Sequence, residues 1–264
     1  MWWQKSRENK FDQEVQHYIT KHTDFTFINL LGYGSYGRTY LIEETSSEDQ
    51  YVLKCLRPKH LHNKKTRHKF MQEIQMLEQL AMTFIPSIKM TGRIQNIPFF
   101  VMAYLDGQTF EQLIFQDGQV FTTSEALTIL EQLLTHIITL HNKGIVHRDL
   151  RIPNILLVEG NLHIIDFGLA TYMKEVNFAS IRNPKRAENH ISDLYFVGHF
   201  LLFLLYSTYK PTSHKEKSWQ EELSLPADVT CYLERLLCIN EPLQSATEAL
   251  HALPKKNRIV QLYL

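Results

Sequence analysis

The first part of the chain alternates short runs of β-branched and aromatic residues with turns, and this pattern predicts a sheet. Such side chains are typical of strands because they pack well on a pleated surface. One stretch between the strands has helical periodicity, residues 64–81, with an apolar stripe of Phe70, Ile74, Leu77 and Ala81. The predicted strands are residues 25–31, 39–42, 51–56, 88–94 and 98–104.

The second part of the chain follows helical rather than strand periodicity. Residues 125–142 carry an apolar stripe, and Ser124 is a suitable N-cap for them. The apolar run 194–206 is too short to span a bilayer and predicts a buried helix. The predicted fold class is therefore α+β, with a small antiparallel sheet and one main helix first and a larger, mostly α-helical part after it.

Composition limits what the chain is expected to bind. A length of 264 residues with 44% hydrophobic content suits one two-lobed domain or two small ones. The formal net charge is +0, so we expect no nucleic-acid partner and no membrane span. The three cysteines have no disulfide or zinc spacing, which is typical of a reducing compartment and predicts a cytoplasmic protein. The oligomeric state does not follow from the sequence.

Three glycines lie between the first two predicted strands, in Gly32-Tyr33-Gly34-Ser35-Tyr36-Gly37-Arg38-Thr39. A glycine-rich loop between strands lets backbone N–H groups approach phosphate oxygens, because no Cβ stands in the way. A dinucleotide-binding loop would lead from a strand into a helix instead. The glycine pattern alone describes a plain β-turn equally well, so it needs support from other residues.

A lysine interrupts the next apolar strand, Tyr51-Val52-Leu53-Lys54-Cys55-Leu56. An ammonium group in an apolar run is costly unless an anion pairs with it. The strand therefore predicts an anionic partner for Lys54.

Two segments of the second part carry the strongest chemical signal. They are His147-Arg148-Asp149-Leu150-Arg151-Ile152-Pro153-Asn154 and Asp166-Phe167-Gly168. A predicted hairpin of residues 155–158 and 162–165 would put Asn154 and Asp166 at neighbouring strand ends, close enough to share metal ions. With the glycine loop and the lysine strand, this order of motifs resembles the eukaryotic-type (Hanks-type) protein kinases, whose catalytic loop has the form H-R-D-L-x-x-x-N and whose metal motif is D-F-G.

The resemblance covers nearly the whole chain from about Phe25 onward and implies a two-lobed protein-kinase-like fold. The expected division is an N-terminal extension (residues 1–24), a kinase N-lobe (residues 25–103) and a kinase C-lobe (residues 104–264). The extension is expected to form a short helix packed on the small lobe or on another subunit, because three apolar residues lie near helical spacing: Phe11, Val15 and Tyr18.

The resemblance also implies ATP as a cofactor with Mg²⁺, for which Mn²⁺ could substitute. Asp149 would accept the proton of the acceptor hydroxyl, and Lys54 would fix the α- and β-phosphates. Asn154 and Asp166 would hold the metal. Arg151 stands where serine/threonine kinases usually carry a lysine that contacts the γ-phosphate, and its planar fork is not equivalent to an ammonium group.

Two carboxylates have supporting roles by the same resemblance. Glu73, on the helix after the lysine strand, would pair with Lys54. Glu78 is a competing candidate, and in the plainer interpretation Glu73 is a solvated helix glutamate. Asp193, in Ser192-Asp193-Leu194-Tyr195-Phe196-Val197-Gly198, would brace the backbone of the catalytic loop from a helix N-terminus.

Residues 99–107 resemble the segment that joins the kinase lobes. Met102 would be the gatekeeper, and the Ala103 and Leu105 backbones would hydrogen-bond adenine. An ordinary buried strand that ends in an Asp-Gly turn describes the same residues. Altogether, the residues implied to bind the nucleotide are Leu31, Gly32, Tyr33, Gly34, Ser35, Tyr36, Gly37, Arg38, Thr39, Val52, Lys54, Glu73, Met102, Ala103, Leu105 and Leu156.

One region departs from the family pattern. Only twenty-four residues (192 − 168) separate Gly168 from Asp193, and Arg186-Ala187-Glu188 lies too near Asp193 to serve as the A-P-E motif. The arginine that pairs with the A-P-E glutamate would fall near Ser245, so both halves of that ion pair are missing and we infer a reduced peptide-docking platform. Two interpretations remain for the hydroxyl groups of this region. They are ordinary loop hydroxyls, or they are phosphorylation sites whose phosphate Arg148 could clamp, and the residues are Thr171, Tyr172 and Ser180.

Three functions remain open at this point. The leading hypothesis is an ATP-dependent protein kinase with a serine/threonine substrate, of the minimal single-domain kind that bacteria carry. The second is a kinase-fold enzyme that phosphorylates a small molecule or a glycan, which the short segment before Asp193 favours. The third is a pseudokinase scaffold, which the presence of Lys54, Asp149, Asn154 and Asp166 disfavours.

Overall fold

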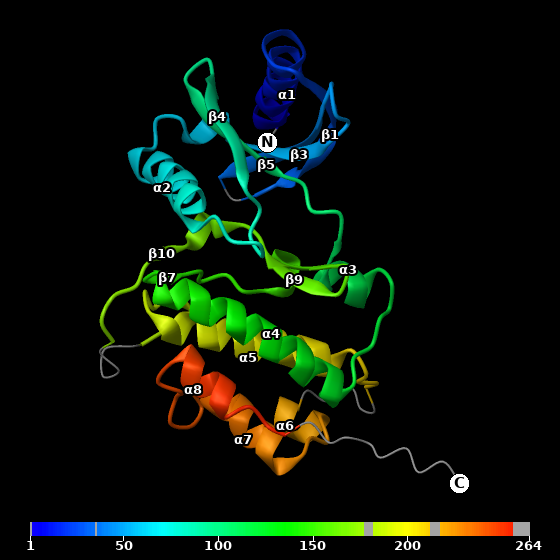
Figure 1. Ribbon diagram of the computed structural model, residues 1–264, viewed down its shortest axis with the longest axis vertical. Coiled ribbons are helices and arrows are strands. Elements are labelled where there is room, and N and C mark those ends of the chain that lie inside the picture. Colours follow the sequence, from blue (N-terminus) through cyan, green and yellow to red (C-terminus); the bar gives the residue numbers. More distant parts are fainter. Residues whose placement is uncertain (1, 35, 177–181, 212–216, 256–264) are drawn as a thin grey trace. The chain divides into compact units, whose positions relative to one another are not determined.

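The computed structural model describes residues 2–34, 36–176, 182–211 and 217–255. The chain divides into two compact units, Met1–Asp106 and Gly107–Leu264, named unit 1 and unit 2 here. Figure 1 shows the sheet that dominates unit 1 and the helices that dominate unit 2. The expected α+β class is confirmed.

Among the described residues, unit 1 is built on an antiparallel sheet in which each predicted strand is present. The strands lie in the order β1-β2-β3-β5-β4, so β1 to β3 form a meander and β5 lies between β3 and β4. Their bounds are β1 Phe25–Tyr33, β2 Gly37–Glu44, β3 Gln50–Leu56, β4 Ile88–Ile94 and β5 Ile97–Ala103.

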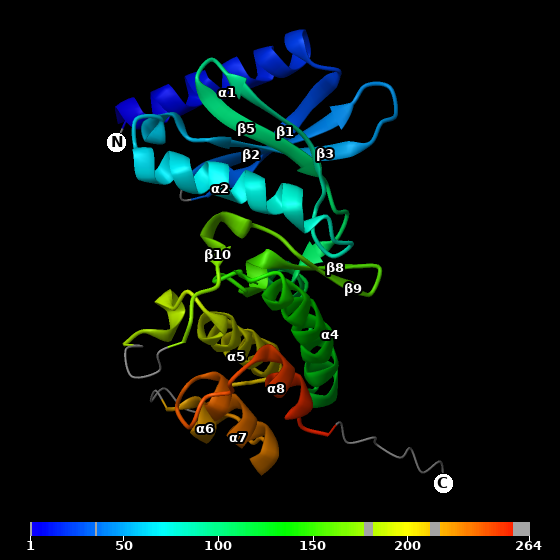
Figure 2. The same ribbon diagram turned by 60° about the vertical axis from the view of Figure 1, so that its left-hand side comes forward.

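The two faces of this sheet carry different side chains. Thr39 of β2 pairs with Lys54 of β3, and Arg38 is the neighbour of Thr39 along the strand. Because successive side chains of a strand point to opposite faces, Arg38 and Lys54 lie on opposite sides of the sheet. Helix α1 (Trp2–His22) covers the Arg38 face and α2 (Lys64–Leu80) covers the Lys54 face, as Figure 2 shows.

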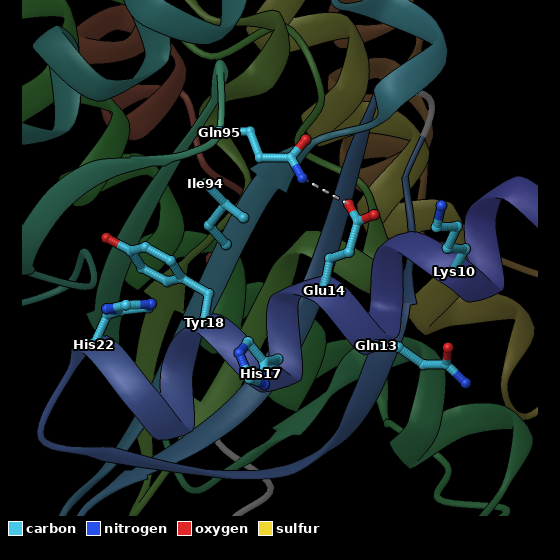
Figure 3. Close-up of a pocket in the computed structure, with 8 residues that line it drawn as sticks. All are labelled: Lys10, Gln13, Glu14, His17, Tyr18, His22, Ile94 and Gln95. Carbon is cyan, nitrogen blue, oxygen red and sulfur yellow. Dashed lines mark hydrogen bonds between the residues drawn. The ribbon is translucent and has the colours of Figure 1, made fainter.

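Helix α1 packs on the sheet of unit 1, one of the two arrangements expected for the extension. Tyr18 meets the ring of Phe99 edge-on, with 5.8 Å between ring centroids. At the turn between β4 and β5, Gln95 Nε2 donates to Glu14 Oε2 over 3.4 Å (Figure 3). The helix has 21 residues, which is longer than expected. Among its side chains from Asn9 onward, which the structure describes, the buried apolar ones are Phe11, Val15 and Ile19.

Helix α2 follows a 3₁₀ turn, η1 (Pro58–His60), and begins at an asparagine cap. The side chain of Asn63 accepts a hydrogen bond from the Thr66 N–H over 3.0 Å, which satisfies a donor that the helix itself leaves unpaired. Three of the predicted stripe residues are buried, whereas Ala81 is exposed at the C-cap. The stripe fixes which face of α2 meets the sheet.

Unit 2 is mainly helical, and α4 lies beside α5 and α8 in its core (Figure 1). The apolar run 194–206 is confirmed as a buried helix within α5. No helix within the described ranges combines the length and the apolar character that a bilayer crossing requires. The helix bounds are α3 Phe110–Phe115, α4 Thr123–Asn142, α5 His190–Tyr206, α6 Trp219–Glu222, α7 Ala227–Leu236 and α8 Ala246–His251.

The N-cap predicted for α4 was wrong, because Thr122 rather than Ser124 caps the helix. Thr122 Oγ1 accepts from the Glu125 N–H over 3.3 Å, and Glu125 Oε2 accepts from the Thr122 N–H over 2.8 Å. Both hydroxyl residues suit a cap, but only Thr122 is followed three residues later by an acid that completes a capping box.

Short strands of unit 2 frame the polar motifs. β8 (Ile155–Val158) and β9 (Asn161–Ile164) form the predicted hairpin, with β6 (Gln108–Thr109) on the other side of β8. β7 (Ile145–Val146) pairs with β10 (Thr171–Tyr172). The segment from His147 to Asn154 therefore runs from β7 to β8, and Asp166 lies just after β9.

Candidate active site

The glycine segment of unit 1 forms the end of the β1–β2 hairpin. The Gly34 N–H donates to the Gly37 carbonyl oxygen over 2.9 Å, and Ser35 lies outside the described residues. A Cβ at position 37 would lie 3.1 Å from Lys54 Cε, a contact tight enough to require movement. The absence of a side chain at Gly37 therefore lets Lys54 pass close under the hairpin.

Lys54 and Glu73 form a buried ion pair, as expected. Lys54 Nζ lies 2.7 Å from Glu73 Oε1, and the side chains are 8% and 1% exposed. Glu78, the competing candidate, is exposed. A buried charge pair of this kind is maintained only when both partners are present, because either one alone would leave an uncompensated charge.

The hairpin also contacts the same glutamate, which the sequence did not indicate. The Tyr36 hydroxyl donates to Glu73 Oε2 over 3.2 Å, and its ring lies 5.6 Å from Lys54 Nζ. Tyr36 also packs edge-on against Phe70 of α2. Both oxygens of Glu73 are thus engaged, one by the lysine and one by the glycine segment.

Two predicted nucleotide-binding residues of unit 1 are oriented in ways that restrict their roles. The Arg38 side chain is fully buried on the α1 face, so any nucleotide contact would have to come from its backbone. The Ala103 N–H donates to the Ser87 carbonyl over 3.0 Å, so a bond to adenine would have to use its carbonyl oxygen. Exposed or half-buried side chains are found at Leu31, Tyr33, Met102 and Leu105, whereas the Val52 side chain is buried.

Asp149 of unit 2 is held from two directions. Asn154 Nδ2 donates to Asp149 Oδ2 over 2.8 Å and to the Asp149 carbonyl over 2.9 Å. Arg151 forks the same carboxylate, with Nε 2.5 Å from Oδ1 and Nη2 3.1 Å from Oδ2. These hydrogen bonds raise the pKa of the Arg151 guanidinium. The sequence placed Arg151 near phosphate, and the fork onto Asp149 was not anticipated.

A buried carboxylate braces the backbone before Asp149, as expected for Asp193. Its oxygens accept from the His147 N–H over 3.0 Å and from the Arg148 N–H over 2.6 Å. Burial alone would raise the pKa of Asp193, but hydrogen bonding from His141 and from the backbone lowers it overall. Arg148 has a φ of 65°, so this brace holds a left-handed backbone conformation in the catalytic loop.

Asn154 and Asp166 lie at neighbouring strand ends, as the predicted hairpin required. The Ile165 N–H donates to the Asn154 carbonyl over 3.0 Å and joins the two segments. Asp166 begins the 3₁₀ turn η3 (Phe167–Leu169), whereas Asn154 ends the turn η2 (Ile152–Asn154). A carboxylate and an amide oxygen are ligands that suit Mg²⁺, which usually takes one or two protein carboxylates together with phosphate and water. The donor set therefore fits this metal.

In the shortened segment between Gly168 and α5, the acidic side chain of Glu188 pairs with two basic side chains. Glu188 lies 2.5 Å from Lys174 Nζ and 3.7 Å from Arg148 Nη1. It follows the turn η5 (Pro184–Arg186). Of the candidate phosphorylation sites, Thr171 and Tyr172 lie in β10, and Ser180 lies outside the described residues. Arg148, which would act as a phosphate clamp in one of the two interpretations, lies beside the Glu188 carboxylate.

Comparison with known proteins assigns these motifs to a family. The model of the protein kinase domain matches residues 25–196. A relative from Bacillus subtilis (strain 168), named "Probable serine/threonine-protein kinase YbdM", is 36% identical over 234 residues, which are 89% of this chain and 90% of the relative. The serine/threonine-protein kinase PrkC of the same organism is 29% identical over 69% of this chain, which spans only 30% of PrkC.

The fold is also found among solved structures. The crystal structure of the Mycobacterium tuberculosis PknI kinase domain matches with a TM-score of 0.66 and covers 87% of this chain and 94% of that domain. Sequence identity is 20%, so this likeness concerns the fold alone. It agrees with the two-lobed α+β class expected from the sequence.

Proposed function

Since the chain belongs to the protein kinase family, we propose that it transfers the γ-phosphate of ATP, in the presence of Mg²⁺, to a serine or threonine hydroxyl of a protein. The observation that carries this proposal is the Asp149 carboxylate. It accepts a hydrogen bond from Asn154, and it follows a stretch of loop backbone that Asp193 holds in place. A positioned carboxylate is what phosphoryl transfer to a hydroxyl requires of the protein, together with charge neutralisation.

Asp149 would act as the base that accepts the acceptor's proton. Its side chain is 12% exposed, so it is shielded yet still reachable. A hydrogen bond from Asn154 Nδ2 to Oδ2 fixes the direction of the carboxylate, and a second one reaches the backbone carbonyl of Asp149. Correct geometry is the first condition for general base catalysis. A carboxylate held in this way loses little freedom when a hydroxyl arrives.

Lys54 would hold the α- and β-phosphates. Its ammonium group is buried and already paired with Glu73, so its position is set before nucleotide arrives. Such preorganised charge stabilises a developing negative charge without a cost for reorganisation at the moment of reaction. Glu73 in this proposal positions the lysine and makes no contact with phosphate.

Asp166 and Asn154 would hold Mg²⁺. When bound, the metal neutralises phosphate charge during transfer. The Asn154 amide donates its Nδ2 protons to Asp149, so its Oδ1 is the atom that would face a cation. Asn154 thus has two tasks in the proposal, since it orients the base with one end and binds the metal with the other.

Arg151 would neutralise the γ-phosphate once nucleotide and acceptor are present. Its side chain is 55% exposed, so it can leave Asp149 without exposing a buried surface. In the described state it occupies both carboxylate oxygens, and the base becomes fully available only when the fork opens. A guanidinium at this place can therefore both protect the base and bind phosphate.

The protein acceptor is supported by the names of the relatives, which are serine/threonine kinases. The second candidate, a small-molecule or glycan acceptor, is favoured by the twenty-four residues (192 − 168) between Gly168 and Asp193, a short platform for a peptide. A cytoplasmic site of action is part of the proposal. It is supported by cysteines that are all free among the described residues, as a reducing compartment would keep them.

The test is the intact mass of the purified chain after incubation with Mg-ATP, beside Asp149→Asn. We expect phosphate to be added to the wild type alone, because removal of a general base costs about 10²- to 10⁴-fold in rate. Asn fills the same volume and can still accept a hydrogen bond, so the variant controls for folding. Equal phosphate on both proteins would exclude Asp149 as the base. ATP binding without phosphate on either protein, followed by turnover with a small-molecule or glycan panel, would favour the second candidate.

A further inference from the structure

Helix α1 lies outside the segment that the protein kinase family model matches, which begins at Phe25. Even so, one of its side chains reaches the base of the glycine hairpin. The Asp12 carboxylate accepts from Arg38 Nη2 through one oxygen and from the Tyr40 hydroxyl, over 2.7 Å, through the other. Arg38 and Tyr40 both belong to β2, the strand that leaves the glycine segment.

Arg38 joins both arms of the hairpin. Its guanidinium carbon lies 4.5 Å from the centre of the Tyr33 ring, and Tyr33 is its partner across β1 and β2. Tyr33 stands between Gly32 and Gly34, so Arg38 contacts the glycine segment itself. A guanidinium stacked on an aromatic face gains further attraction when water is excluded.

The burial of Arg38 makes an anion at Asp12 important. The Arg38 side chain is 0% exposed, whereas Asp12 is 25% exposed. A buried guanidinium cannot give up its proton, so its charge must be balanced by a nearby anion. Burial raises the pKa of the Tyr40 hydroxyl and raises that of the neighbouring Cys55 thiol to about 12, so both stay neutral near pH 7. Within this cluster, the Asp12 carboxylate is an acidic group that pairs with Arg38.

The opposite face of the same strands carries the proposed phosphate-binding lysine. Arg38 pairs with Cys55, and the next pair along is Thr39 with Lys54. The Gly37 backbone lies so close to Lys54 Cε that a side chain there would press on it. A shift of β2 at Arg38 would therefore be transmitted to the glycine segment and to the surroundings of Lys54.

We propose that Asp12 is a positioning residue for nucleotide binding, which acts through Arg38 and Tyr40 to hold the glycine hairpin in place. The inference rests on the proposed ATP-dependent function. It gives α1 a role in nucleotide binding by unit 1. Asp12 touches no nucleotide in this scheme, and its effect passes through the fixed geometry of β2.

The test compares Asp12→Ala and Asp12→Glu with wild type in the full chain. Two quantities are measured, the equilibrium affinity for a fluorescent ATP analogue and the KM and kcat for ATP. We expect Asp12→Ala to weaken nucleotide affinity and raise KM by about fivefold or more. The variant loses the hydrogen bond to the charged Arg38 side chain, which holds β2 in place. The change in kcat should be smaller, and Asp12→Glu, which keeps the carboxylate, should recover part of the affinity.

Glu14→Gln is the matched control. Glu14 lies on the same helix, and its carboxylate bonds Gln95 at the β4–β5 turn, away from the glycine hairpin (Figure 3). This variant should leave KM unchanged. If Asp12→Ala fails to fold, Tyr40→Phe removes one of the two donors to Asp12 and leaves the ring in place, and a smaller rise in KM is expected from it.

Two results with the variants would overturn the inference. One is an Asp12→Ala protein with a lower melting temperature and unchanged KM and affinity, which would make the cluster merely structural. The other is an equal loss in Glu14→Gln, which would make the effect one of the helix in general. A wild type that binds the analogue without transferring phosphate overturns the proposed function and leaves the affinity test valid. A wild type that binds no nucleotide overturns both.

Discussion

The two ion pairs that have roles in the proposed function, one in each unit, differ in how far they are removed from water. In unit 1, the partners Lys54 and Glu73 are 8% and 1% exposed. In unit 2, Asp149 is 12% exposed, but its partner Arg151 is 55% exposed. The first pair is therefore fixed by the packing around it, whereas the second can open because Arg151 is half exposed and Asp149 keeps its hydrogen bond from Asn154.

The difference suits the tasks proposed for them. A lysine that must meet phosphates in one place gains from a partner that never leaves. Asp149 must release Arg151 when the acceptor arrives. This release costs little because the Arg151 guanidinium is half exposed, and ion pairs with exposed partners contribute only about 0–1 kcal/mol. The contrast predicts that the two pairs respond very differently to substitution.

Lys54→Met should have the largest effect. It leaves Glu73 buried without its cation, and the loss of one partner of a buried pair costs about 3–5 kcal/mol in the free energy of unfolding. Loss of a preorganised positive group should also reduce phosphate transfer by about 10²-fold or more. Urea unfolding and the rate of ATP turnover measure the two effects.

The double variant Lys54→Met with Glu73→Leu is the control for this contrast. Replacement of the whole pair by apolar side chains should recover much of the stability, because no charge remains buried. Activity should stay low. If the single variant were as stable as wild type, Glu73 would not need Lys54 and the pair would resemble the exposed one.

Arg151→Ala should have a moderate effect that is confined to activity. The free energy of unfolding should change by less than about 1 kcal/mol, because the guanidinium is half exposed. The rate of transfer should fall by about tenfold, and Arg151→Lys should restore part of it by supplying an ammonium group to phosphate. A stability loss as large as that of Lys54→Met would contradict the distinction between the pairs.

Acidification should produce the smallest effect, with its origin in unit 2. Burial lowers the pKa of several histidines there, namely His136, His147, His163, His190 and His199. Between the unfolded value near 6.5 and the lower folded values, the unfolded chain binds more protons, so stability is present above about pH 6.5 and is lost as pH falls.

Hydrogen exchange at pH 7.5 and pH 5.5 would measure this loss region by region. The catalytic loop beside His147 should lose protection as the pH falls, although Asp193, Asp166 and Asp149 oppose the shift by favouring the charged imidazole. Protection in the loop that stays equal or rises at pH 5.5 would show that the buried histidines do not control stability in this range.

The Lys54–Glu73 pair could be predicted because two independent signals converged on it. A lysine in an apolar strand needs an anion, and the family resemblance supplied a helix with a glutamate beside its buried stripe. The hairpin that brings Asn154 near Asp166 followed from strand and turn patterns in the same way. Local patterns of this kind predict the folded structure well, because the side chains that form the core are the ones that make up the pattern.

The Asp12–Arg38–Tyr40 cluster could not be predicted, because it joins a helix to a strand 26 and 28 positions away. Strand alternation could have placed Arg38 and Tyr40 on one buried face, and Asp12 follows Phe11 of the α1 stripe. Neither pattern says that α1 lies over β2. The hydrogen bonds from Arg151 to Asp149 could not be predicted either. A side chain with several rotatable bonds can reach several neighbours, and only the folded loop determines which of them lie close to it.

The backbone at Asp166 has a φ of 61° and a ψ of 76°, and its side chain accepts from the Gly168 N–H over 3.3 Å. Position 166 is therefore constrained twice, once by the conformation of the chain and once by the carboxylate proposed to hold a metal. Asparagine and aspartate tolerate left-handed backbone better than other residues with a side chain. A change to alanine would disturb the turn as well as remove the charge, so asparagine is the replacement that separates the chemistry of this residue from its shape.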